Sequence, residues 1–385
     1  MYKTIKYNIL IVLVLIIIVE IFLWFIPVPD PYSNIKVQLL NNKNENKYIE
    51  SQFERNLNLK FSTEKGLLGF ENYKKNTDFT INNFGFRGDN LTSPKPKNEY
   101  RIFAIGGSTT ENLYIDDNDS WPYLLQNKLN QNKYNNNIKV YNAGKSGDNI
   151  QDHIAMLSHR IIHLNPDEII LFCGVNDITR LILDGNPLKF YKNSQTITSN
   201  SFLKMLRFFS TEFQIPRRLF YVLKTQNEVF TQITGTSDYK SKTEKAKSLK
   251  NEKSIPKIDY QNFKQKLEVF IGICKSKNIK LNIITQVTTW DTKDKNLLDW
   301  QWMTVKGDVR YSNLELQFVM DSINLIQVKT ANKFNIPILE ANKKIQKNGL
   351  FFYDDCHFNP NGNKKFAEEL TNFMTTLNNH NYGND

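Results

Sequence analysis

The sequence predicts an α/β fold, a three-layer, doubly wound parallel sheet with helices on both faces. Short apolar runs typical of buried strands recur along the chain, at residues 101–105, 138–141, 168–173, 279–287 and 336–339. Segments with helical apolar spacing alternate with them, at residues 121–129, 150–164, 259–276, 314–334 and 362–377. Strands separated by helices pair in parallel through right-handed crossovers, so helices are expected on both faces of the sheet.

The composition indicates a packed globular body. The 385 residues are enough for one large domain or two small ones, and 40% of them are apolar. The net charge of +11 admits an anionic partner, but the basic residues are spread along the chain, with many between residues 239 and 280, which favours a solvated surface. No zinc-ligand spacing, RNA-binding signature or repeat period is seen, so no nucleic-acid partner is expected. The three cysteines, Cys173, Cys274 and Cys356, make no disulfide framework.

Residues 9–26 form an apolar run that only Glu20 interrupts. A helix of this length extends about 27 Å, which is enough to span a bilayer. The run is longer than the apolar part of a usual signal peptide, and residues 25–29 offer no small-residue cleavage site, so an uncleaved anchor is favoured over a cleaved signal peptide. Lys3 and Lys6 precede the run, and the positive-inside rule therefore places the rest of the chain outside the cytoplasm, in a periplasm or the extracellular space.

These observations divide the chain into three parts. Residues 1–27 are the expected N-terminal transmembrane anchor, residues 28–97 an extracytoplasmic lead-in segment, and residues 98–380 the α/β domain. An insertion at about residues 181–257 breaks the alternation of strands and helices within that domain.

The sequence of two segments within these parts allows a more detailed prediction. In the insertion we expect a partial helical cap at residues 202–223, followed by a mobile, solvated loop in the Lys-, Ser- and Glu-rich run at residues 236–253. In the lead-in, residues 84–88 (Phe-Gly-Phe-Arg-Gly) indicate a loop packed against the main body. Arg87 there has either a structural or a site-lining role.

Three candidate functional loops each follow a predicted strand. Gly-Gly-Ser at 106–108 follows the first strand, the glycine-containing segment 144–147 the second, and Gly-Val-Asn-Asp at 174–177 the third. Ligands of an open α/β sheet bind outside the carboxyl ends of the strands. The three loops are therefore expected to converge on one edge of the sheet, where Ser108 presents its hydroxyl.

A serine hydroxyl is a weak nucleophile and needs a neighbouring base. His357 is the best candidate, because it lies in a loop before a helix and has Asp354 three residues before it. In a tight loop this spacing returns the carboxylate to the imidazole and holds its tautomer, with Asp355 as the rival for that role. The other histidines lie in a predicted helix or in a polar tail, namely His153, His159, His163 and His380. Serine, histidine and aspartate together predict nucleophilic acyl-transfer chemistry.

Acyl transfer also needs donors for a developing oxyanion. The Gly147 amide suits this role because no Cβ hinders its approach to a ligand. Asn176 offers a side-chain NH₂ at the end of the third strand, and the amide of Ser108 itself is the third expected donor.

These blocks, in this order, resemble those of the SGNH (GDSL-like) hydrolase superfamily. The serine block resembles GGSTT at 106–110, the glycine block NAGKSG at 142–147, the GxND block GVND at 174–177, and the DxxH block DDCHFN at 354–359. Upstream, NFGFRG at 83–88 resembles a lead-in of membrane-anchored bacterial members. The resemblance covers about residues 81–377 apart from the insertion.

The resemblance implies that Ser108 is the nucleophile, His357 the base and Asp354 its orienting carboxylate. It places Gly147 and Asn176 with the Ser108 amide in the oxyanion hole. No metal and no cofactor are expected.

Two positions in the serine block differ from the motifs of related hydrolases. Gly107 stands where the GDSL form has an aspartate, which separates the chain from plain GDSL members in subfamily and substrate. Thr110 stands where the G-x-S-x-G elbow of α/β-hydrolases has its second glycine.

Substrate contacts are expected from aromatic residues at the same edge. Trp290, Trp300 and Trp302 follow the strand at 279–287, and they either stack on a sugar ring, line an acyl groove or anchor a covering loop. Arg180, just after GVND, is a weak candidate for attracting an anionic substrate.

We expect a membrane-anchored serine esterase whose partner is an acylated glycan or lipid ester, with deacetylation of a surface glycan as the leading hypothesis. An O-acyltransferase uses the same catalytic set, and a lipid esterase or thioesterase is the next alternative. A non-catalytic membrane-anchored scaffold is a different class, which the intact catalytic set disfavours.

Overall fold

Five parallel strands form the central sheet of the protein, in the order β10-β7-β5-β3-β4. Their bounds are Ile338–Leu339 for β10, Lys280–Ile284 for β7, Glu168–Phe172 for β5, Tyr100–Gly106 for β3 and Ile138–Gly144 for β4. Numbered along the chain, this is the order 5-4-3-1-2, so the chain reverses direction across the sheet between β3 and β5. The predicted α/β fold with a parallel central sheet is confirmed.

The structure is a computed structural model that describes residues 2–26, 53, 55–63, 66–131, 137–183, 213–215, 239–249, 252–306 and 309–382. The chain divides into two compact units. One comprises Met1–Glu45 with Tyr191–Ser237, and the other comprises Asn46–Phe190 with Asp238–Asp385 and contains the sheet.

The smaller unit contains α1 (Tyr2–Trp24), which forms over most of the apolar run. The Glu20 carboxylate accepts hydrogen bonds from the backbone amides of Gln214 and Ile215. Across the residues that the structure describes, no helix has both the length and the apolar character needed to cross a membrane. The anchor therefore stays a prediction. The helical cap expected at 202–223 lies outside the described residues, apart from 213–215.

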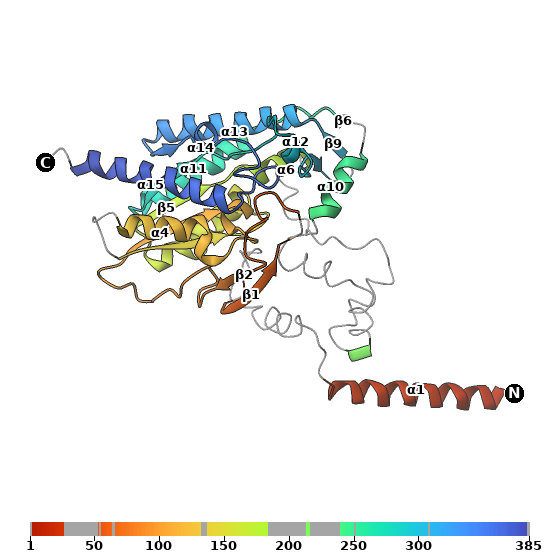
Figure 1. Cartoon of the computed structure of the whole chain (residues 1–385). Helices are drawn as coiled ribbons and strands as arrows, with labels where there is room; N and C mark the ends of the chain where they lie inside the picture. Colours follow the sequence, from red (N-terminus) through yellow and green to blue (C-terminus); the bar gives the residue numbers. More distant parts are fainter. Residues whose placement is uncertain are drawn as a thin grey trace. The chain divides into compact units, whose positions relative to one another are not determined.

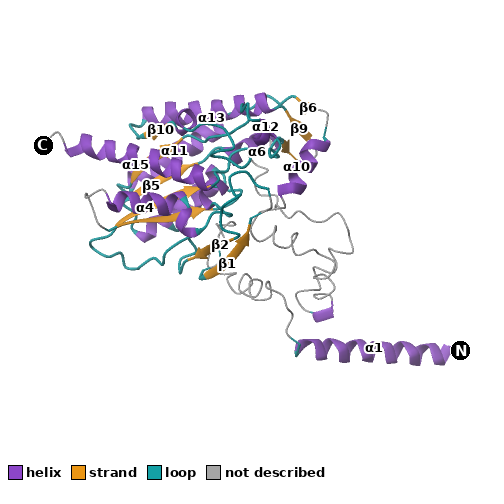
Figure 2. Cartoon of the chain, in the orientation of Figure 1, coloured by secondary structure: helices purple, strands orange, loops and turns teal. Residues whose placement is uncertain are grey.

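In the larger unit, helices cover both faces of the sheet (Figures 1 and 2). The side chains of β3 show why, since Phe103 and Ile105 join one apolar cluster while Ile102 and Ala104 join the other. This alternation is what a strand buried on both faces requires. The expected three layers are present.

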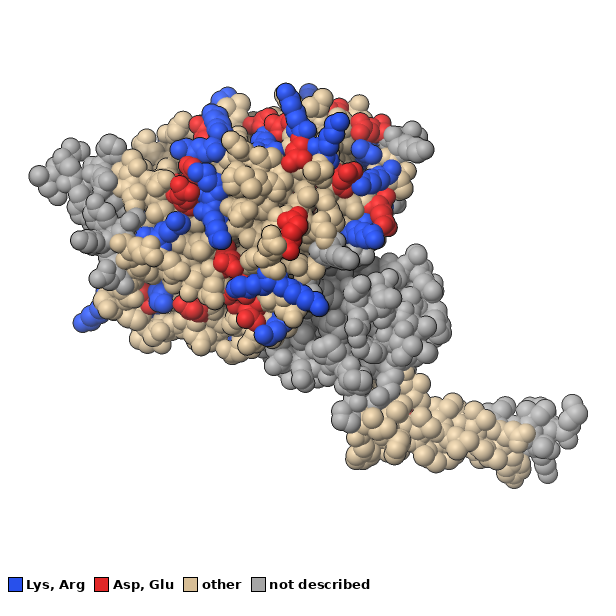
Figure 3. Space-filling model, in the orientation of Figure 1, with Lys and Arg blue, Asp and Glu red and all other residues tan. Residues whose placement is uncertain are grey.

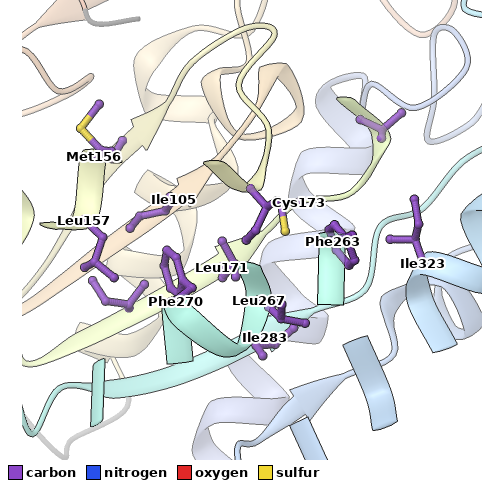
Figure 4. Packing of buried hydrophobic residues seen from close by; sticks show 14 of the residues in the cluster. Ile105, Met156, Leu157, Leu171, Cys173, Phe263, Leu267, Phe270, Ile283 and Ile323 are labelled. Carbon is purple, nitrogen blue, oxygen red and sulfur yellow. The ribbon is translucent and has the colours of Figure 1, made fainter. Parts of the chain in front are cut away.

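The first apolar cluster is covered by four helices, α5 (Ile150–His159), α6 (Val175–Leu183), α11 (Gln261–Ser276) and α13 (Asn313–Lys333). Figure 4 shows its centre, where Leu171 of β5 and Ile283 of β7 lie beside Leu267 and Phe270 of α11. These four side chains are all buried. Their burial fixes the helical layer against the sheet without any polar contact.

Three further helices cover the opposite face, α4 (Trp121–Gln131), α14 (Ala341–Lys344) and α15 (Pro360–Tyr382). Phe366 of α15 lies 5.0 Å edge-on from Trp121 and 4.9 Å from Phe172, measured between ring centroids. Phe358 stacks on Phe366 at 5.0 Å. Because Phe358 directly follows His357, this aromatic packing ties the histidine loop to the core.

Two parts of the larger unit differ from the sequence-based expectation. The lead-in contains an antiparallel hairpin of β1 (Leu57–Ser62) and β2 (Asn76–Ile81) that the irregular pattern did not predict. The expected mobile loop at 236–253 is wrong, because the structure has helix α10 (Tyr239–Ser248) there, followed by strand β6 (Glu252–Lys253). Helix α10 buries Tyr239, Thr243 and Ala246, which lie on one face at helical spacing amid polar residues.

Small elements complete the unit. Strand β6 joins β8 (Val305–Lys306) and β9 (Val309–Tyr311) in a three-stranded sheet, and α12 (Lys295–Leu298) lies between β7 and β8. The α3 helix (Ser108–Glu111) follows β3 directly. Basic and acidic side chains are interspersed on the face shown in Figure 3, as expected for a solvated surface. All three cysteines are free and buried.

Two roles were predicted for Arg87, structural or site-lining, and its contacts are those of a structural residue. Its side chain is buried, and its Nη1 donates to the carbonyl oxygens of Glu111 and Asn112, each at 2.6 Å. Its Nε donates to Asp117 at 2.8 Å, and the guanidinium lies over the ring of Phe79. Arg87 thereby clamps the loop that follows α3.

Candidate active site

The register of the sheet brings the three candidate loops together. Gly106 at the end of β3 pairs with Gly144 at the end of β4 and with Phe172 at the end of β5. The loops that follow these strands therefore start side by side, at the point where the chain order reverses.

The serine loop has no room for side chains before Ser108. A Cβ on Gly106 would lie 2.2 Å from Thr110 Oγ1 and 2.5 Å from the Phe172 carbonyl oxygen. A Cβ on Gly107 would lie 2.5 Å from Asn176 Nδ2. Glycine at both positions lets α3 begin immediately after the strand, and Ser108 is its first residue.

Ser108 and His357 meet across 249 positions of sequence, with Ser108 Oγ 2.7 Å from His357 Nε2. On its other side, His357 Nδ1 lies 2.7 Å and 2.8 Å from the two carboxylate oxygens of Asp354. Since Nδ1 faces a carboxylate, it carries the proton, and Nε2 is free to accept from the serine hydroxyl. This is the geometry of a nucleophile, a base and an orienting acid.

Asp354 is fully buried and accepts several hydrogen bonds besides that of the imidazole. The backbone amides of Cys356 and His357 donate to its Oδ1 at 3.0 Å and 2.9 Å, and the Trp302 indole donates to Oδ2 at 3.0 Å. Burial alone would raise the pKa of Asp354, but His357 and the two backbone hydrogen bonds hold it below the usual value. The stability that this carboxylate contributes is therefore present above its unfolded pKa and is lost as the pH falls through the lower folded value.

Asp355, the rival for the orienting role, faces away from the imidazole. Its carboxylate accepts from the Trp290 indole at 2.7 Å and from the backbone amides of Trp302 and Met303 at 2.7 Å and 3.0 Å. Burial, together with the charge of Asp354, raises the pKa of Asp355 to about 6. Asp355 thus fastens the segment that carries Trp302 to the histidine loop.

The glycine loop is a tight turn over residues 145–148. The Asp148 amide donates to the Lys145 carbonyl at 3.1 Å, and Gly147, at the third position, has a φ of +86°. A type II turn requires a left-handed φ at that position, which only glycine adopts without strain. The closing hydrogen bond uses neither the Ser146 nor the Gly147 amide.

Asn176 lies at the start of α6, beside both other loops. Its Nδ2 donates to the Asp148 carbonyl at 2.8 Å, and the same atom is the one that a Cβ on Gly107 would meet. The structure therefore brings Asn176 against the serine loop and the Gly147 turn. The side-chain amide has a second N–H besides the one given to Asp148.

The tryptophans and the arginine predicted to contact substrate lie at different distances from the site, and their contact with substrate stays a prediction. Trp290 is buried and bonded to Asp355, whereas Trp302 is partly buried and bonded to Asp354. Trp300 is partly buried near Gly66 of the lead-in. Arg180 is partly buried on α6, one turn after Asn176 and on the same helix face.

Two tyrosines that sequence reasoning missed flank the imidazole. Tyr353 stacks on His357 at 5.5 Å between ring centroids with an interplanar angle of 12°, and Tyr239 of α10 lies edge-on at 6.2 Å. Their hydroxyl oxygens are 3.5 Å apart. Tyr239 also packs edge-on against Trp302, whose ring lies 3.8 Å from Lys242 Nζ. No sequence signal pointed to Tyr239, because it stands in a polar run.

Asp354, Cys356 and His357 also form a compact group of metal-ligand types, with donor atoms within 4.8 Å of one another. Burial raises the pKa of the Cys356 thiol well above its usual value, which leaves it protonated and a poor ligand. The imidazole lies between Ser108 and Asp354. This donor set fits a catalytic dyad better than a metal site.

The family described as "GDSL-like Lipase/Acylhydrolase" matches residues 102–370, and the chain belongs to it. It is therefore an ester-hydrolysing enzyme of the SGNH type. No curated protein matches the chain.

Solved structures similar to the chain include three esterases or acylhydrolases. The acetyl xylan esterase AlAXEase is 16% identical, with 70% of this chain and 97% of that one covered and a TM-score of 0.39. The lipase/acylhydrolase from Enterococcus faecalis is 14% identical, with coverages of 72% and 96% and a TM-score of 0.41. A catalytic mutant of the acetylxylan esterase Axe2 from Geobacillus stearothermophilus is 13% identical, with coverages of 73% and 96% and a TM-score of 0.41.

The Trp302 hydrogen bond to Asp354 gives a testable prediction. Trp302→Phe keeps a ring but removes the indole N–H, so the carboxylate that orients His357 loses a donor. A hydrogen bond to a charged group is worth about 1.5–3 kcal/mol, and we expect kcat for ester hydrolysis to fall about tenfold with the fold retained.

The matched control is Tyr100→Phe, which removes a 2.9 Å hydrogen bond to the buried Glu168 at the opposite end of the sheet. Its kcat should equal that of the wild type. Equal kcat values for Trp302→Phe and the wild type would show that the indole does not support the dyad.

Proposed function

We propose that the enzyme hydrolyses esters through an acyl-enzyme on Ser108. The observation that carries the proposal is the continuous hydrogen-bonded line from Ser108 Oγ through His357 to Asp354, with each step at 2.7–2.8 Å. A serine within bonding distance of an oriented imidazole is the arrangement that activates a hydroxyl for attack on a carbonyl.

In the first half-reaction, Ser108 Oγ attacks the ester carbonyl carbon while His357 Nε2 takes the hydroxyl proton. The imidazolium that forms is stabilised by the buried Asp354 carboxylate beside Nδ1. When the tetrahedral intermediate collapses, the C–O bond to the alcohol breaks and Nε2 returns the proton to the leaving oxygen. In the second half-reaction, water attacks the acyl-enzyme, with His357 acting again as base and then as acid.

The oxyanion of each tetrahedral intermediate needs donors at the edge where Ser108 lies. The Gly147 amide, the second N–H of Asn176 and the Ser108 amide are our candidates. Support comes from the Gly147 turn, whose closing bond leaves that amide unused, and from the hydrogen bond of Asn176 to the same turn. Preorganised donors of this kind are often the largest single contribution to acyl-transfer catalysis.

We propose a short acyl group on a carbohydrate, as in deacetylation of a surface glycan. The support is the partly exposed Trp302 beside Asp354, which offers an aromatic ring to a sugar. Tyr239 and Tyr353 beside His357 are buried, with their hydroxyl groups facing each other. Bulky rings next to the catalytic base also favour a small acyl group over a long chain. Transfer to a hydroxyl would use the same acyl-enzyme, and it is distinguished from hydrolysis by the acceptor that releases the acyl group.

The nucleophile is tested with the purified chain from about residue 32 onward, which lacks α1. We expect it to hydrolyse a short-chain aryl ester and to be labelled by a fluorophosphonate, and we expect Ser108→Ala to lose both properties. The loss of hydrolysis should exceed about 1,000-fold because the variant has no group to acylate. Hydrolysis by the variant at the wild-type rate would refute the assignment of Ser108.

We also propose that α1 anchors the enzyme and that the catalytic unit lies outside the cytoplasm. The apolar run at 9–26 and the two lysines before it support this orientation. In spheroplasts that express the full chain, added protease should degrade the catalytic unit while a cytoplasmic marker survives. Full protection of the catalytic unit until the membrane is lysed would contradict the proposal.

A further inference from the structure

Glu111 is a buried carboxylate beside the nucleophile that the mechanism above does not use. It is the last residue of α3, three positions after Ser108, and its side chain has no exposure to solvent. Its Oε2 accepts a hydrogen bond from the backbone amide of Ser146. In the part of the chain that the structure describes, its Oε1 has no hydrogen-bond partner.

Such a residue is costly for the stability of the fold. Removing a carboxylate from water costs several kcal/mol unless hydrogen bonds or opposite charges compensate. An apolar side chain of similar size would fill the same space without that cost. Residues that break the rules of stable packing are concentrated at functional sites, and Glu111 lies at one.

The partner of Glu111 stands in the middle of the Gly147 turn. The two ends of the turn are held by other groups, since the Lys145 amide donates to the Gly106 carbonyl at 3.0 Å and Asn176 donates to the Asp148 carbonyl at 2.8 Å. The hydrogen bond from Ser146 to Glu111 holds the residue directly before Gly147. It therefore fixes the Lys145–Ser146 peptide unit, which is directly before the unit that carries the Gly147 N–H, the candidate oxyanion donor.

The helix that carries Glu111 is itself firmly held. Arg87 donates to the carbonyl oxygens of Glu111 and Asn112 at the carboxyl end of α3. The end of β4 packs against the same segment, because a Cβ on Gly144 would lie 2.3 Å from the Glu111 amide nitrogen. Ser108 and the Glu111 carboxylate thus belong to one rigid four-residue element.

We propose that Glu111 is a positioning residue that sets the Gly147 amide at the correct distance from Ser108 for oxyanion binding. This inference rests on the proposed function. Ser108, the nucleophile, is at one end of α3, and Glu111, which holds the Gly147 turn through the Ser146 amide, is at the other end. One helix therefore fixes the positions of the nucleophile and of the turn. Glu111 acts through Ser146 and Gly147 and does not touch the substrate.

Two substitutions separate the hydrogen bond from the charge. Glu111→Gln keeps the side-chain length and an oxygen acceptor but removes the charge. Glu111→Asp keeps the charge, but it is one methylene shorter and cannot reach the Ser146 amide. Glu111→Ala removes both, and Glu168→Gln serves as the control for loss of a buried carboxylate at the opposite end of the sheet.

The experiment measures kcat and KM for a short-chain aryl ester, with thermal unfolding of each variant. We expect Glu111→Ala and Glu111→Asp to lower kcat about 10- to 100-fold with KM within about threefold of the wild type, because an oxyanion donor acts mainly in the transition state. Glu111→Gln and Glu168→Gln should keep kcat within about threefold. If Glu111 had a purely structural role, its variants would lower the unfolding temperature, but kcat would not separate Glu111→Gln from Glu111→Asp.

Two results would overturn the inference. One is a wild-type kcat for Glu111→Ala, and the other is retention of kcat by Glu111→Asp with loss by Glu111→Gln, which would assign the effect to charge. Failure of the proposed function gives a different result. In that case the wild-type enzyme itself neither hydrolyses the ester nor reacts with a fluorophosphonate at Ser108.

Discussion

The contact between Asp354 and His357 is the interaction on which the rest of the site depends. In this contact, the Asp354 carboxylate has no exposure to solvent and lies against the imidazole. The pKa of Asp354 remains below the usual value even though burial opposes the charge. Such a charge is tolerated only where enough donors face it. Two backbone amides, the imidazole and the Trp302 indole supply them. The tautomer of His357, in which Nε2 can accept a hydrogen bond from Ser108, follows from this arrangement.

The surrounding structure can be understood as support for that contact. Asp355 accepts a hydrogen bond from the backbone amide of Trp302, and the Trp302 indole donates to Asp354. Asp355 therefore helps to position the indole that donates to Asp354. Phe358 anchors the histidine loop in the aromatic cluster around Phe366. Helix α10 adds Tyr239, which packs against both Trp302 and His357. The inserted region therefore contributes to the surroundings of His357.

Much of this arrangement could be predicted from the sequence, for a physical reason. Strands buried on both faces are continuous apolar runs, and the functional loops follow them directly, so the end of each run locates a loop. The sequence favoured Asp354 over Asp355 but left Asp355 as a rival, because both lie close to His357 in sequence and only the turn geometry separates them. Glu111 and Trp302 act on partners 35 and 52 residues away, and no local pattern records such pairs. Helix α10 was missed because three residues bury one face of an otherwise polar segment.

The central claim is tested most directly by kcat of Asp354→Asn. Asparagine keeps the size of the side chain and can still accept from the backbone amides, but its NH₂ faces Nδ1 and drives the proton of the imidazole to Nε2. The imidazole then presents a donor to Ser108 instead of an acceptor, and we predict that kcat for ester hydrolysis falls about 10³- to 10⁴-fold while the protein remains folded. A folded Asp354→Asn enzyme with kcat within about threefold of the wild type would contradict the account.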